Sequence, residues 1–448
     1  MRNPMVVQLP LVGFLVKHEH AKEIQVISDR LDAMPGALQL VHSDLIRGLK
    51  FPEVGREGMS ADQVLRILLI KQVRSFSYEQ LTFELDANTT YREFCRIGLQ
   101  DAIPAKTTIQ ENIKRIQPET LEAINRLILK AAAEEGIEKG RKVRIDATGV
   151  ETNIHPPSDS EQLYDVNRVL TRIMLQQAEK FPFHFKNQVE RAKRRRMNIL
   201  NDKKTEDRTR HYRDLLKVTR KTINEARRIA TLIANNGLEA LAAATELRRI
   251  AQLGDQVVSQ TERRVIKGEN VPAAEKIFSI FEEHTDIIVK GKDKKEDILF
   301  GHKLTLTGGA SNLILDCVIE DGNPADSTRA IPMIERQKDI YGRVPRQATF
   351  DGCYASKENL EEAKKLGVKD VAFSKKRGLE VEDMTKSPWV YRMLNRFRAG
   401  IESGISFLKR CMGLTRVTWH GETSFKAYVW SSIIAANLLT LSRHTIAA

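Results

Sequence analysis

Residues 143–148 are Val-Arg-Ile-Asp-Ala-Thr, a strand-like run that carries an aspartate, Asp146. Most of its neighbours are apolar or β-branched and show no helical stripe, so the pattern predicts a β-strand between about residues 142 and 153. An ionised carboxylate is costly in an apolar strand unless it is paired or binds a metal ion. Asp146 is therefore the first candidate site residue.

Two further segments carry an acidic residue in a comparable setting. Residues 347–352 are Gln-Ala-Thr-Phe-Asp-Gly, a strand that would end at Asp351, and strand ends commonly hold site residues in α/β sheets. A later helical pattern projects Arg398, Glu402 and Lys409 within about 40° of one another at 100° per residue. Three separated carboxylates on such elements could hold two magnesium ions, which activate water or a 3′ hydroxyl in phosphodiester chemistry.

Each of these segments also has an ordinary explanation. An aspartate at a strand end is often a cap or a solvated turn residue, and Arg398 with Glu402 has the spacing of a helical salt bridge worth only about 0.2–0.5 kcal/mol. The hypothesis of a catalytic site therefore rests on the combination of the three carboxylates and not on any single one.

The order of predicted elements is that of a mixed α/β layer protein. After the first strand comes a long helical stretch to about residue 284. Strands are then predicted at 301–307 and 313–319, joined through Gly308 and Gly309, and again at 346–350 and 370–373. Helices are predicted at 327–341 and 356–366, and a long helix surrounds Glu402.

Short helices with tight turns precede the first strand. Two Ser-x-x-Gln pairs, beginning at Ser60 and Ser77, have capping-box spacing, and Thr108 with Glu111 repeats this spacing after a turn at residues 103–106. This texture is typical of a helix-turn-helix domain, in which the helix after the turn enters a DNA groove. An ordinary helix with a solvated basic face explains the same pattern equally well. The candidate DNA contacts of this helix are Lys106, Thr107, Thr108, Gln110, Lys114 and Arg115.

The charge of the chain favours a polyanionic partner. The 448 residues carry a formal net charge of +13, a balance shared by nucleic-acid-binding proteins, proteins of ribosome or membrane surfaces, and basic enzymes. Between residues 180 and 228, 17 Lys and Arg stand against 6 Asp and Glu, in a broken apolar pattern that predicts a helical hairpin or small bundle. Such a bundle could clamp the phosphate backbone without base specificity, and a solvated coiled coil or dimer arm is the alternative. Its candidate DNA contacts are Arg191, Arg194, Arg195 and Arg196.

Other features restrict the protein class. The four cysteines lie far apart without a C-x-x-C pair, which argues against a zinc ribbon and a disulfide framework. No run approaches the roughly 18–20 apolar residues of a membrane span, so we expect no membrane partner.

The order Asp, Asp, Glu on strand, strand and helix, with R-x3-E-x6-K spacing at the last, resembles the DDE transposases of bacterial insertion sequences. The resemblance runs from about residue 142 to residue 442 and implies an RNase H-like catalytic fold. Residues 146–160, Asp-Ala-Thr-Gly-Val-Glu-Thr-Asn-Ile-His-Pro-Pro-Ser-Asp-Ser, are similar to the first-aspartate region of one subgroup. The N-terminal helices resemble the end-binding domain of such enzymes.

The resemblance implies roles for individual residues. Asp146, Asp351 and Glu402 would be catalytic and would bind two Mg²⁺ or Mn²⁺ ions. Phosphate or DNA near the site would be contacted by Arg398, Lys409 and Tyr354. Two departures concern substrate handling and not the carboxylates. Asn395 stands where the family often has a tyrosine, and the glycine of the family's D-x-G-Y run is displaced to position 352.

Together these features predict an α/β protein with an all-helical N-terminal domain, an RNase H-like mixed-sheet core and a long helical insertion. The predicted regions are an N-terminal segment (1–50), a helical DNA-binding domain (51–138), a catalytic domain (139–160 with 285–448) and a basic helical insertion (161–284). The implied function is a transposase that binds terminal inverted repeats, cleaves double-stranded DNA and transfers the strand to target DNA. A homodimer on paired ends in the cytoplasm, associated with the nucleoid, is implied as well. The alternatives are an RNase H-like nuclease without strand transfer and a non-catalytic DNA-binding protein.

Overall fold

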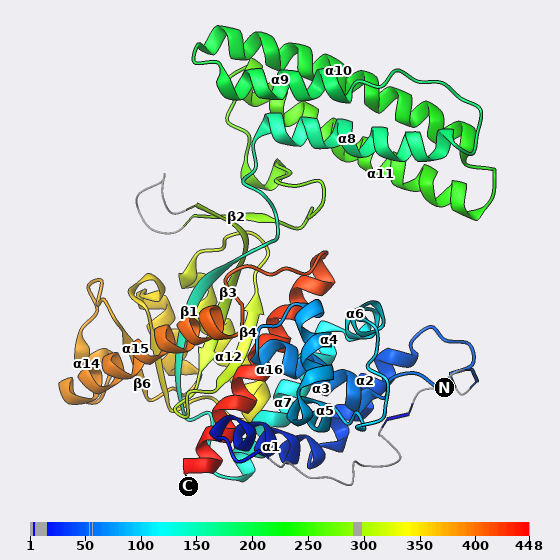
Figure 1. Cartoon of the computed structure of the whole chain (residues 1–448). Helices are drawn as coiled ribbons and strands as arrows, with labels where there is room; N and C mark the ends of the chain where they lie inside the picture. Colours follow the sequence, from blue (N-terminus) through cyan, green and yellow to red (C-terminus); the bar gives the residue numbers. More distant parts are fainter. Residues whose placement is uncertain (1–2, 5–15, 53, 56, 290–297, 448) are drawn as a thin grey trace. The chain divides into compact units, whose positions relative to one another are not determined.

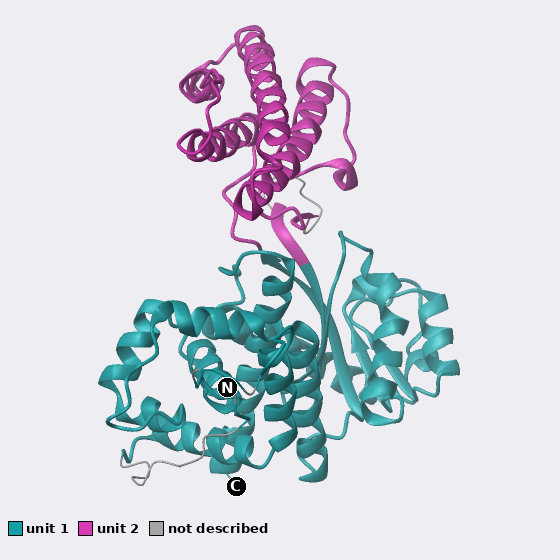
Figure 2. Cartoon of the chain, turned by 90° about the vertical axis from the view of Figure 1, so that its right-hand side faces the viewer, with its two compact units in different colours: residues 1–151, 303–448 teal, residues 152–302 magenta. Residues whose placement is uncertain are grey.

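The computed structural model describes residues 3–4, 16–52, 54–55, 57–289 and 298–447. The first 15 residues of the predicted N-terminal segment, except 3 and 4, therefore lie outside the described residues. One unit contains residues 1–151 and 303–448, and a second unit contains residues 152–302 (Figure 2). The predicted insertion, 161–284, lies within the second unit, and the predicted boundary at 138/139 falls within the first.

A mixed sheet carries the aspartate-bearing strands. Its strands are β1 (Lys142–Glu151), β2 (Asp286–Val289), β3 (Ile298–Gly308), β4 (Ile314–Ile319), β5 (Gln347–Phe350) and β6 (Asp370–Phe373). The strand order is β2-β3-β1-β5-β6, and β4 pairs with β3. The β1–β5 and β5–β6 pairs are parallel, and the β2–β3 and β3–β4 pairs are antiparallel. The predicted mixed α/β class is confirmed.

One strand was not predicted. β2, together with residues 298–301 of β3 to which it pairs, belongs to the second unit. The helical stretch predicted to about residue 284 ends earlier, because the last long helix stops at Thr261 and a π-helical turn continues it to Ile266. The sequence of β2 is only four residues long, Asp-Ile-Ile-Val, and a run this short gives no period that separates a strand from the end of a helical pattern.

The helices of the first unit flank the sheet and fill the N-terminal region (Figure 1). They are α1 (Glu19–Asp32), α2 (Pro35–Ile46), α3 (Ala61–Val73), α4 (Tyr78–Ala87), α5 (Thr89–Phe94), α6 (Lys106–Arg115), α7 (Pro118–Glu134), α12 (Ala330–Tyr341), α13 (Lys357–Lys365), α14 (Val381–Met384), α15 (Pro388–Cys411) and α16 (Glu422–Ala447). Short 3-10 turns lie at Asp326–Arg329 and Gly352–Tyr354.

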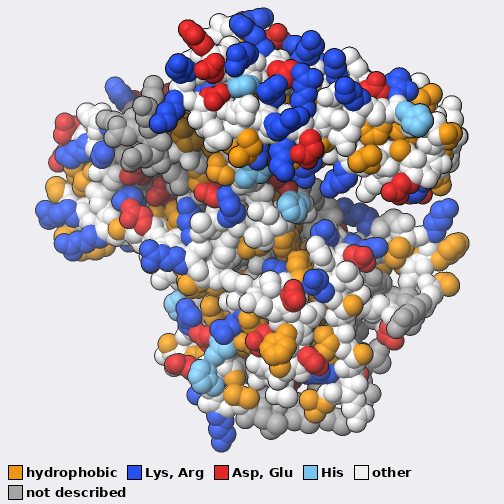
Figure 3. Space-filling model, turned by 45° about the horizontal axis from the view of Figure 1, so that its top comes forward, with side chains coloured by type: hydrophobic (Ala, Val, Ile, Leu, Met, Phe, Trp, Pro, Cys, Tyr) orange, Lys and Arg blue, Asp and Glu red, His pale blue; other side chains and the backbone are white. Residues whose placement is uncertain are grey.

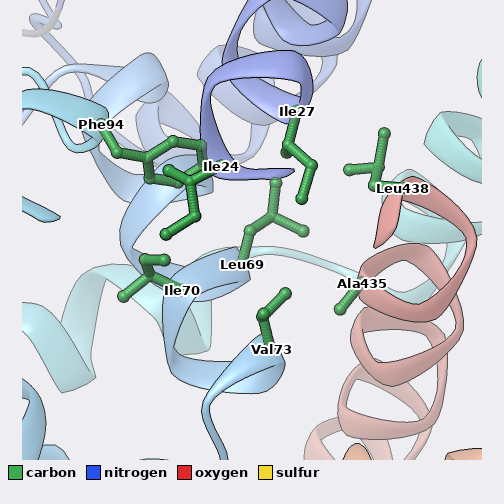
Figure 4. A pocket seen from close by; sticks show the side chains of 8 residues that line it. All are labelled: Ile24, Ile27, Leu69, Ile70, Val73, Phe94, Ala435 and Leu438. Carbon is green, nitrogen blue, oxygen red and sulfur yellow. The ribbon is translucent and has the colours of Figure 1, made fainter. Parts of the chain in front are cut away.

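The C-terminal helix joins the N-terminal helices to the sheet. α16 packs against α1, α3 and α7. Asn437 of this helix donates to Oδ1 of Asn125 on α7 and accepts from the backbone amide of Ile314 on β4, both at 2.8 Å. One apolar core therefore extends from the N-terminal helices into the strands. The small cavity where α1, α3 and α16 meet is entirely apolar and belongs to this packing (Figure 4).

Local sequence explains most of the helix starts. The capping boxes predicted at Ser60 and Ser77 are confirmed, because each serine side chain accepts from the backbone amide three residues on and the glutamine there bonds back. The box predicted at Thr108 is wrong. α6 begins two residues earlier, at Lys106, so Thr108 already lies in its first turn, and the N-cap position holds Ala105.

Four helices form most of the second unit, namely α8 (Asp159–Ala178), α9 (Val189–Asn201), α10 (Thr205–Ile233) and α11 (Leu238–Thr261). α10 packs against the other three around an apolar core of their own. A buried Asn167 on α8 donates to Oγ1 of Thr219 and accepts from Oγ1 of Thr222, both at 2.7 Å. These bonds satisfy the amide inside the bundle and set the register of α8 against α10.

Candidate active site

Two aspartates lie side by side at the carboxyl edge of the sheet. The last registered pair of the parallel strands β1 and β5 is Ile145 opposite Phe350. Asp146 and Asp351 each follow this pair by one residue, so they occupy equivalent positions beside each other. Neighbouring strands are about 4.8 Å apart. β5 ends at Phe350, directly before Asp351, whereas β1 continues past Asp146 to Glu151. Asp146 therefore lies inside its strand, at the level where the neighbouring strand β5 ends.

A serine continues this row onto the next strand. Phe350 of β5 is also opposite Phe373 of β6, and Ser374 is therefore the residue equivalent to Asp351. The Ser374 hydroxyl donates to Oδ1 of Asp351 at 2.8 Å. Sequence reasoning missed Ser374, although its position directly after the apolar end of β6 was a usable signal.

α15 brings the third carboxylate to the aspartates. The side chain of Arg398 is only 16% exposed, and its Nη1 lies 3.9 Å from Oδ2 of Asp146 and 3.7 Å from Oδ1 of Asp351. Its Nη2 donates to Oε1 of Glu402 at 3.0 Å. One guanidinium therefore contacts three carboxylates, the first of which precedes the other two by more than two hundred residues along the chain.

Two glycines allow the close packing around these groups. Arg144 of β1 runs against α15, donating to the carbonyl of Phe397 at 3.2 Å, and a Cβ on Gly400 would collide with its guanidinium. A Cβ on Gly352 would come within 2.7 Å of Cβ of Lys375, in the segment that follows Ser374. Larger residues at either position would push α15 or the segment after β6 away from the aspartates.

The two aspartates differ in their electrostatics. Burial, with the charge of Asp351 adding to it, raises the pKa of Asp146 to about 6, although the amide of Ala147 and Arg398 act in the opposite direction. Burial acts in the same way on Asp351, but hydrogen bonds from Ser374 and the amide of Gly352, together with Arg398, outweigh it and lower the pKa of this carboxyl. Asp351 is therefore ionised at neutral pH, and its charge is part of what makes ionisation of Asp146 costly.

The donor set fits a divalent cation. Carboxylate oxygens are the ligands that Mg²⁺ and Mn²⁺ prefer, and a cation would relieve the repulsion between Asp146 and Asp351. The ligand atoms of the three carboxylates do not all lie within 4.8 Å of one another. In this structure the positively charged Arg398 guanidinium contacts all three carboxylates.

Within the described ranges, one group does have three metal-ligating side chains whose ligand atoms all lie within 4.8 Å of one another. It consists of His155, Glu161 and Asp165 in the second unit. Both carboxylates are already paired with arginines: Nη1 of Arg196 lies 2.5 Å from Glu161 and Nη2 of Arg168 lies 2.8 Å from Asp165. These two charges weaken the attraction for a metal ion, so we interpret the group as an ion-pair network.

Family models identify the kind of protein that carries this centre. Residues 278–438 match a transposase DDE domain, and residues 23–115 match a transposase domain, DUF772. The chain belongs to the DDE-type transposases of insertion sequences. Comparison with curated proteins and with solved structures gave no significant match.

The family assignment confirms the predicted fold class, because the DDE domain implies an RNase H-like core. The matched range of this transposase contains Asp351, Arg398 and Glu402, while Asp146 precedes it. Members of the family act on DNA and generally use divalent metal ions. Throughout the part of the chain that the structure describes, no helix is both long and apolar enough to cross a membrane.

Tyr354 of the transposase is buried, contrary to its predicted contact with DNA. Its side chain has no exposed surface, and its ring packs on Phe350 with 5.5 Å between ring centroids. The 3-10 turn after Asp351 rotates the tyrosine into the core beneath the strand. The predicted contact of Tyr354 with DNA is therefore wrong for this structure, and its role here is packing.

Lys409 lies in the last turn of α15, about 16 Å along the helix from Arg398.

Two further charged groups at the centre were missed. Asp326 lies close enough for its charge to raise the pKa of Asp146 and of Tyr354, and it pairs with Lys303 at 2.5 Å. Three consecutive basic residues, 375–377, follow Ser374 and are exposed. Asp326 had no pattern of its own in the sequence, and the basic run gave no sign that the fold places it beside the residue after Asp351.

The basic side of α6 faces solvent. Ile109 and Ile113 pack into the helical core, while Lys106, Thr107, Thr108 and Lys114 are exposed and Gln110 is half-buried. Nη1 of Arg115 donates to the carbonyl of Leu45 at 3.0 Å, which ties the end of α6 to α2.

The arginines predicted to contact DNA from the second unit are mostly engaged in ion pairs. Arg191 and Arg195 both bind Asp214, at 2.5 and 2.6 Å, and Arg196 binds Glu161. Arg194 is exposed and has no ion-pair partner among the described residues. Lys and Arg side chains nevertheless gather on the face of the bundle seen in Figure 3. Exposed basic residues of the bundle that sequence reasoning did not single out are Lys193, Arg213, Lys217 and Lys221.

Proposed function

We propose that this transposase binds the terminal inverted repeats of its element, cleaves the DNA to free a 3′ hydroxyl, and joins that hydroxyl to target DNA. The proposal is carried by one observation, the convergence of Asp146, Asp351 and Glu402 on Arg398 at the carboxyl edge of the sheet. The three carboxylates would hold two Mg²⁺ or Mn²⁺ ions. Such ions lower the pKa of a bound water or hydroxyl and stabilise the leaving oxygen of a phosphodiester.

Both steps exchange one phosphorus–oxygen bond for another. In the first, water attacks the scissile phosphorus, the bond to the 3′ oxygen breaks, and that oxygen takes up a proton. In the second, the freed 3′ hydroxyl loses its proton and attacks a phosphorus of the target strand, whose bond to its own 3′ oxygen breaks, and that oxygen takes up a proton. Asp351, held ionised by Ser374, would be the permanent anionic ligand, and Arg398 would bind a phosphate oxygen and orient Glu402. Lys409 would contact DNA further along α15.

DNA contacts of the two helical parts complete the proposal. α6 would read the terminal repeats through its exposed basic side, and the helical insertion would hold the phosphate backbone through residues such as Arg194, Arg213 and Lys217. Two copies would act together on paired ends, because both ends of the element must be processed. The proposed setting is the cytoplasm, at the nucleoid.

The first test is cleavage and strand transfer on the element's own flanking DNA, with Mg²⁺ and with EDTA. We expect metal-dependent joined products from the wild type and a loss of about 10²-fold or more in Glu402→Gln, since this change removes the ligand charge and keeps the shape. Glu382→Gln, an exposed glutamate on α14, is the matched control and should leave the rate unchanged.

The outcomes separate the alternatives. Cleavage without joined products would indicate a nuclease and would contradict strand transfer. Wild-type binding without any metal-dependent cleavage would indicate a non-catalytic DNA-binding protein. Full activity in Glu402→Gln would mean that Glu402 is not the third ligand.

Terminal-repeat binding by α6 gives a second prediction. The double change Lys106→Ala with Lys114→Ala should reduce the slope of log affinity against log salt by about 1.8, because each lost phosphate contact removes about 0.9. Lys130→Ala, at an exposed position of α7, is the control. Binding isotherms of repeat DNA between low and physiological salt measure the slope, and an unchanged slope in the double variant would exclude α6 from the phosphate contacts.

A further inference from the structure

The solvent side of α15 carries an aromatic and basic stripe, which consists of Trp389, Arg392 and Arg396. These residues project within about 60° of one another at 100° per residue. Trp389 is 59% exposed, and both arginines are exposed without an ion-pair partner among the described residues. The other side of this end of α15 packs on β6 through Val390 and Leu394. The fold thus leaves the stripe uncovered.

Trp389 is the unusual member of the stripe. The other two tryptophans, Trp419 and Trp430, are 8% and 4% exposed and belong to the core. An indole left in water forgoes the stabilisation of burial, and tryptophan is a residue that contributes strongly when a partner covers it. Met393, one turn further along and 38% exposed, enlarges the apolar part of the surface.

The charge of the helix identifies the partner. α15 contains five basic residues against a single acidic one, Glu402. A surface of this sign attracts a polyanion and repels a basic protein such as a second copy of this chain. Trp389 precedes Glu402 by 13 residues, about 20 Å of helix, a length spanned by about six stacked nucleotides. At 100° per residue the stripe projects about 80–140° around α15 from Glu402, so it forms a surface separate from the carboxylates. The partner that fits an exposed indole flanked by two arginines is a nucleic-acid strand.

We propose that the stripe binds an unpaired stretch of the DNA substrate, with Trp389 stacked on a base and Arg392 and Arg396 bound to adjacent phosphates. Bases within a duplex already stack on both neighbours, so a side chain that stacks face to face selects a base that is unpaired. This assignment deepens the proposed function and rests on it only in taking DNA as the substrate. It adds a strand-binding surface on the solvent side of α15, apart from the carboxylates.

The test uses the full chain in EDTA, so that binding is observed without cleavage. An oligothymidylate of about 16 nucleotides should quench the exposed tryptophan fluorescence of the wild type, and this quenching should be absent in Trp389→Phe. Trp389→Ala should weaken single-strand binding about tenfold, and Trp389→Phe should retain most of the affinity because a ring still stacks. The double change Arg392→Ala with Arg396→Ala should lower the salt slope on single strands by about 1.4.

Matched controls separate this role from a general surface effect. Phe83→Ala removes an aromatic side chain that is 69% exposed on α4, and Lys338→Ala removes an exposed charge on α12. Both should leave single-strand affinity and slope unchanged. Equal losses in the controls would overturn the assignment. The assignment would also be overturned if Trp389→Ala lost as much affinity for duplex DNA as for single strands. A changed oligomeric state of the Trp389→Ala variant in the absence of DNA would overturn it as well.

Strand binding by the stripe and the transposition reaction can fail separately. If the wild type joins DNA ends but oligothymidylate does not quench Trp389, the stripe is not a strand-binding surface and the transposition reaction stands. If quenching and the affinity losses occur but no metal-dependent cleavage is found, the stripe stands and the proposed reaction does not.

Discussion

Replacing Arg398 by alanine is expected to tighten the binding of Mn²⁺ about tenfold while it slows DNA cleavage by about 10²–10³-fold. The guanidinium lies 3.7–3.9 Å from Asp351 and Asp146 and donates to Glu402. It therefore neutralises the charge that a divalent ion would otherwise meet. Removing one nearby positive charge makes the carboxylates more attractive to a cation, even after screening by water at a partly exposed site.

The two effects have opposite signs because Arg398 would do two things. In the absence of DNA it acts as an internal counter-ion for the carboxylates. When substrate and metal ions are present, a phosphate oxygen would be its partner, and the variant would lack that contact in the transition state. Mn²⁺ affinity is measured by titration calorimetry or electron paramagnetic resonance without DNA, and cleavage is measured separately.

Two variants serve as controls for this prediction. Arg398→Lys keeps the charge, so its Mn²⁺ affinity should stay near that of the wild type, although a lysine cannot donate in a fork. Arg346→Ala removes an exposed charge just before β5, at the opposite end of the strand from Asp351. Its Mn²⁺ affinity should be unchanged. Weaker Mn²⁺ binding in Arg398→Ala would show that the arginine orients the ligands and does not compete with the ion.

The candidate carboxylates could be found from the sequence because local pattern determines where a strand ends. Asp351 follows an apolar run that ends β5, and Asp146 lies inside the apolar run of β1, which the parallel pairing places beside it. The helical spacing of Arg398 and Glu402 likewise predicts their hydrogen bond, which the structure contains. These inferences need only the period of each element and the order of elements along the chain.

What could not be predicted depends on contacts between distant segments. The triple contact of Arg398 requires the angle at which α15 crosses β1, and that angle depends on the space that Gly400 leaves for Arg144. The DNA contact predicted for Tyr354 was wrong because a motif gives the position of a residue but not the direction of its side chain. Here the 3-10 turn after Asp351 directs the tyrosine into the core. Trp389 carries no periodic signal that separates an exposed ring from a buried one.

Asp146→Asn is expected to abolish cleavage and strand transfer, by about 10³-fold or more, and to stabilise the metal-free protein at the same time. The first effect follows from the loss of an anionic ligand beside Asp351. The second follows from the cost of ionising Asp146, whose pKa is raised to about 6 by burial and by the charge of Asp351. Asparagine is isosteric and neutral, and its oxygen can still accept from the amide of Ala147, as Asp146 does at 2.8 Å.

The stabilisation depends on pH with a definite sign. The native pKa lies above that of the unfolded chain, 3.8, so the native state binds the proton more tightly than the unfolded state. The favourable contribution of the protonated carboxyl is complete below about pH 4 and is lost as pH rises through about 6. In EDTA at pH 8 the variant should therefore exceed the wild type in free energy of unfolding by about 2–3 kcal/mol. The difference should disappear near pH 4.

Thermal unfolding in EDTA at a series of pH values, with DNA cleavage in Mg²⁺ beside it, measures both effects on one variant. Asp316→Asn is the control of opposite sign, because Asp316 is buried and binds Arg336 through both oxygens, at 2.5 and 2.8 Å. The change leaves Arg336 with Glu122, at 3.2 Å, as its ion-pair partner, and the loss of the charged hydrogen bonds to Asp316 should destabilise the protein by about 2 kcal/mol. If Asp146→Asn is inactive and less stable than the wild type at pH 8, the loss of activity results from damage to the fold and not from the loss of a metal ligand. An inactive but more stable protein would identify Asp146 as a residue kept at a cost in stability, which is expected of a carboxylate whose charge is needed only when a cation and DNA are bound.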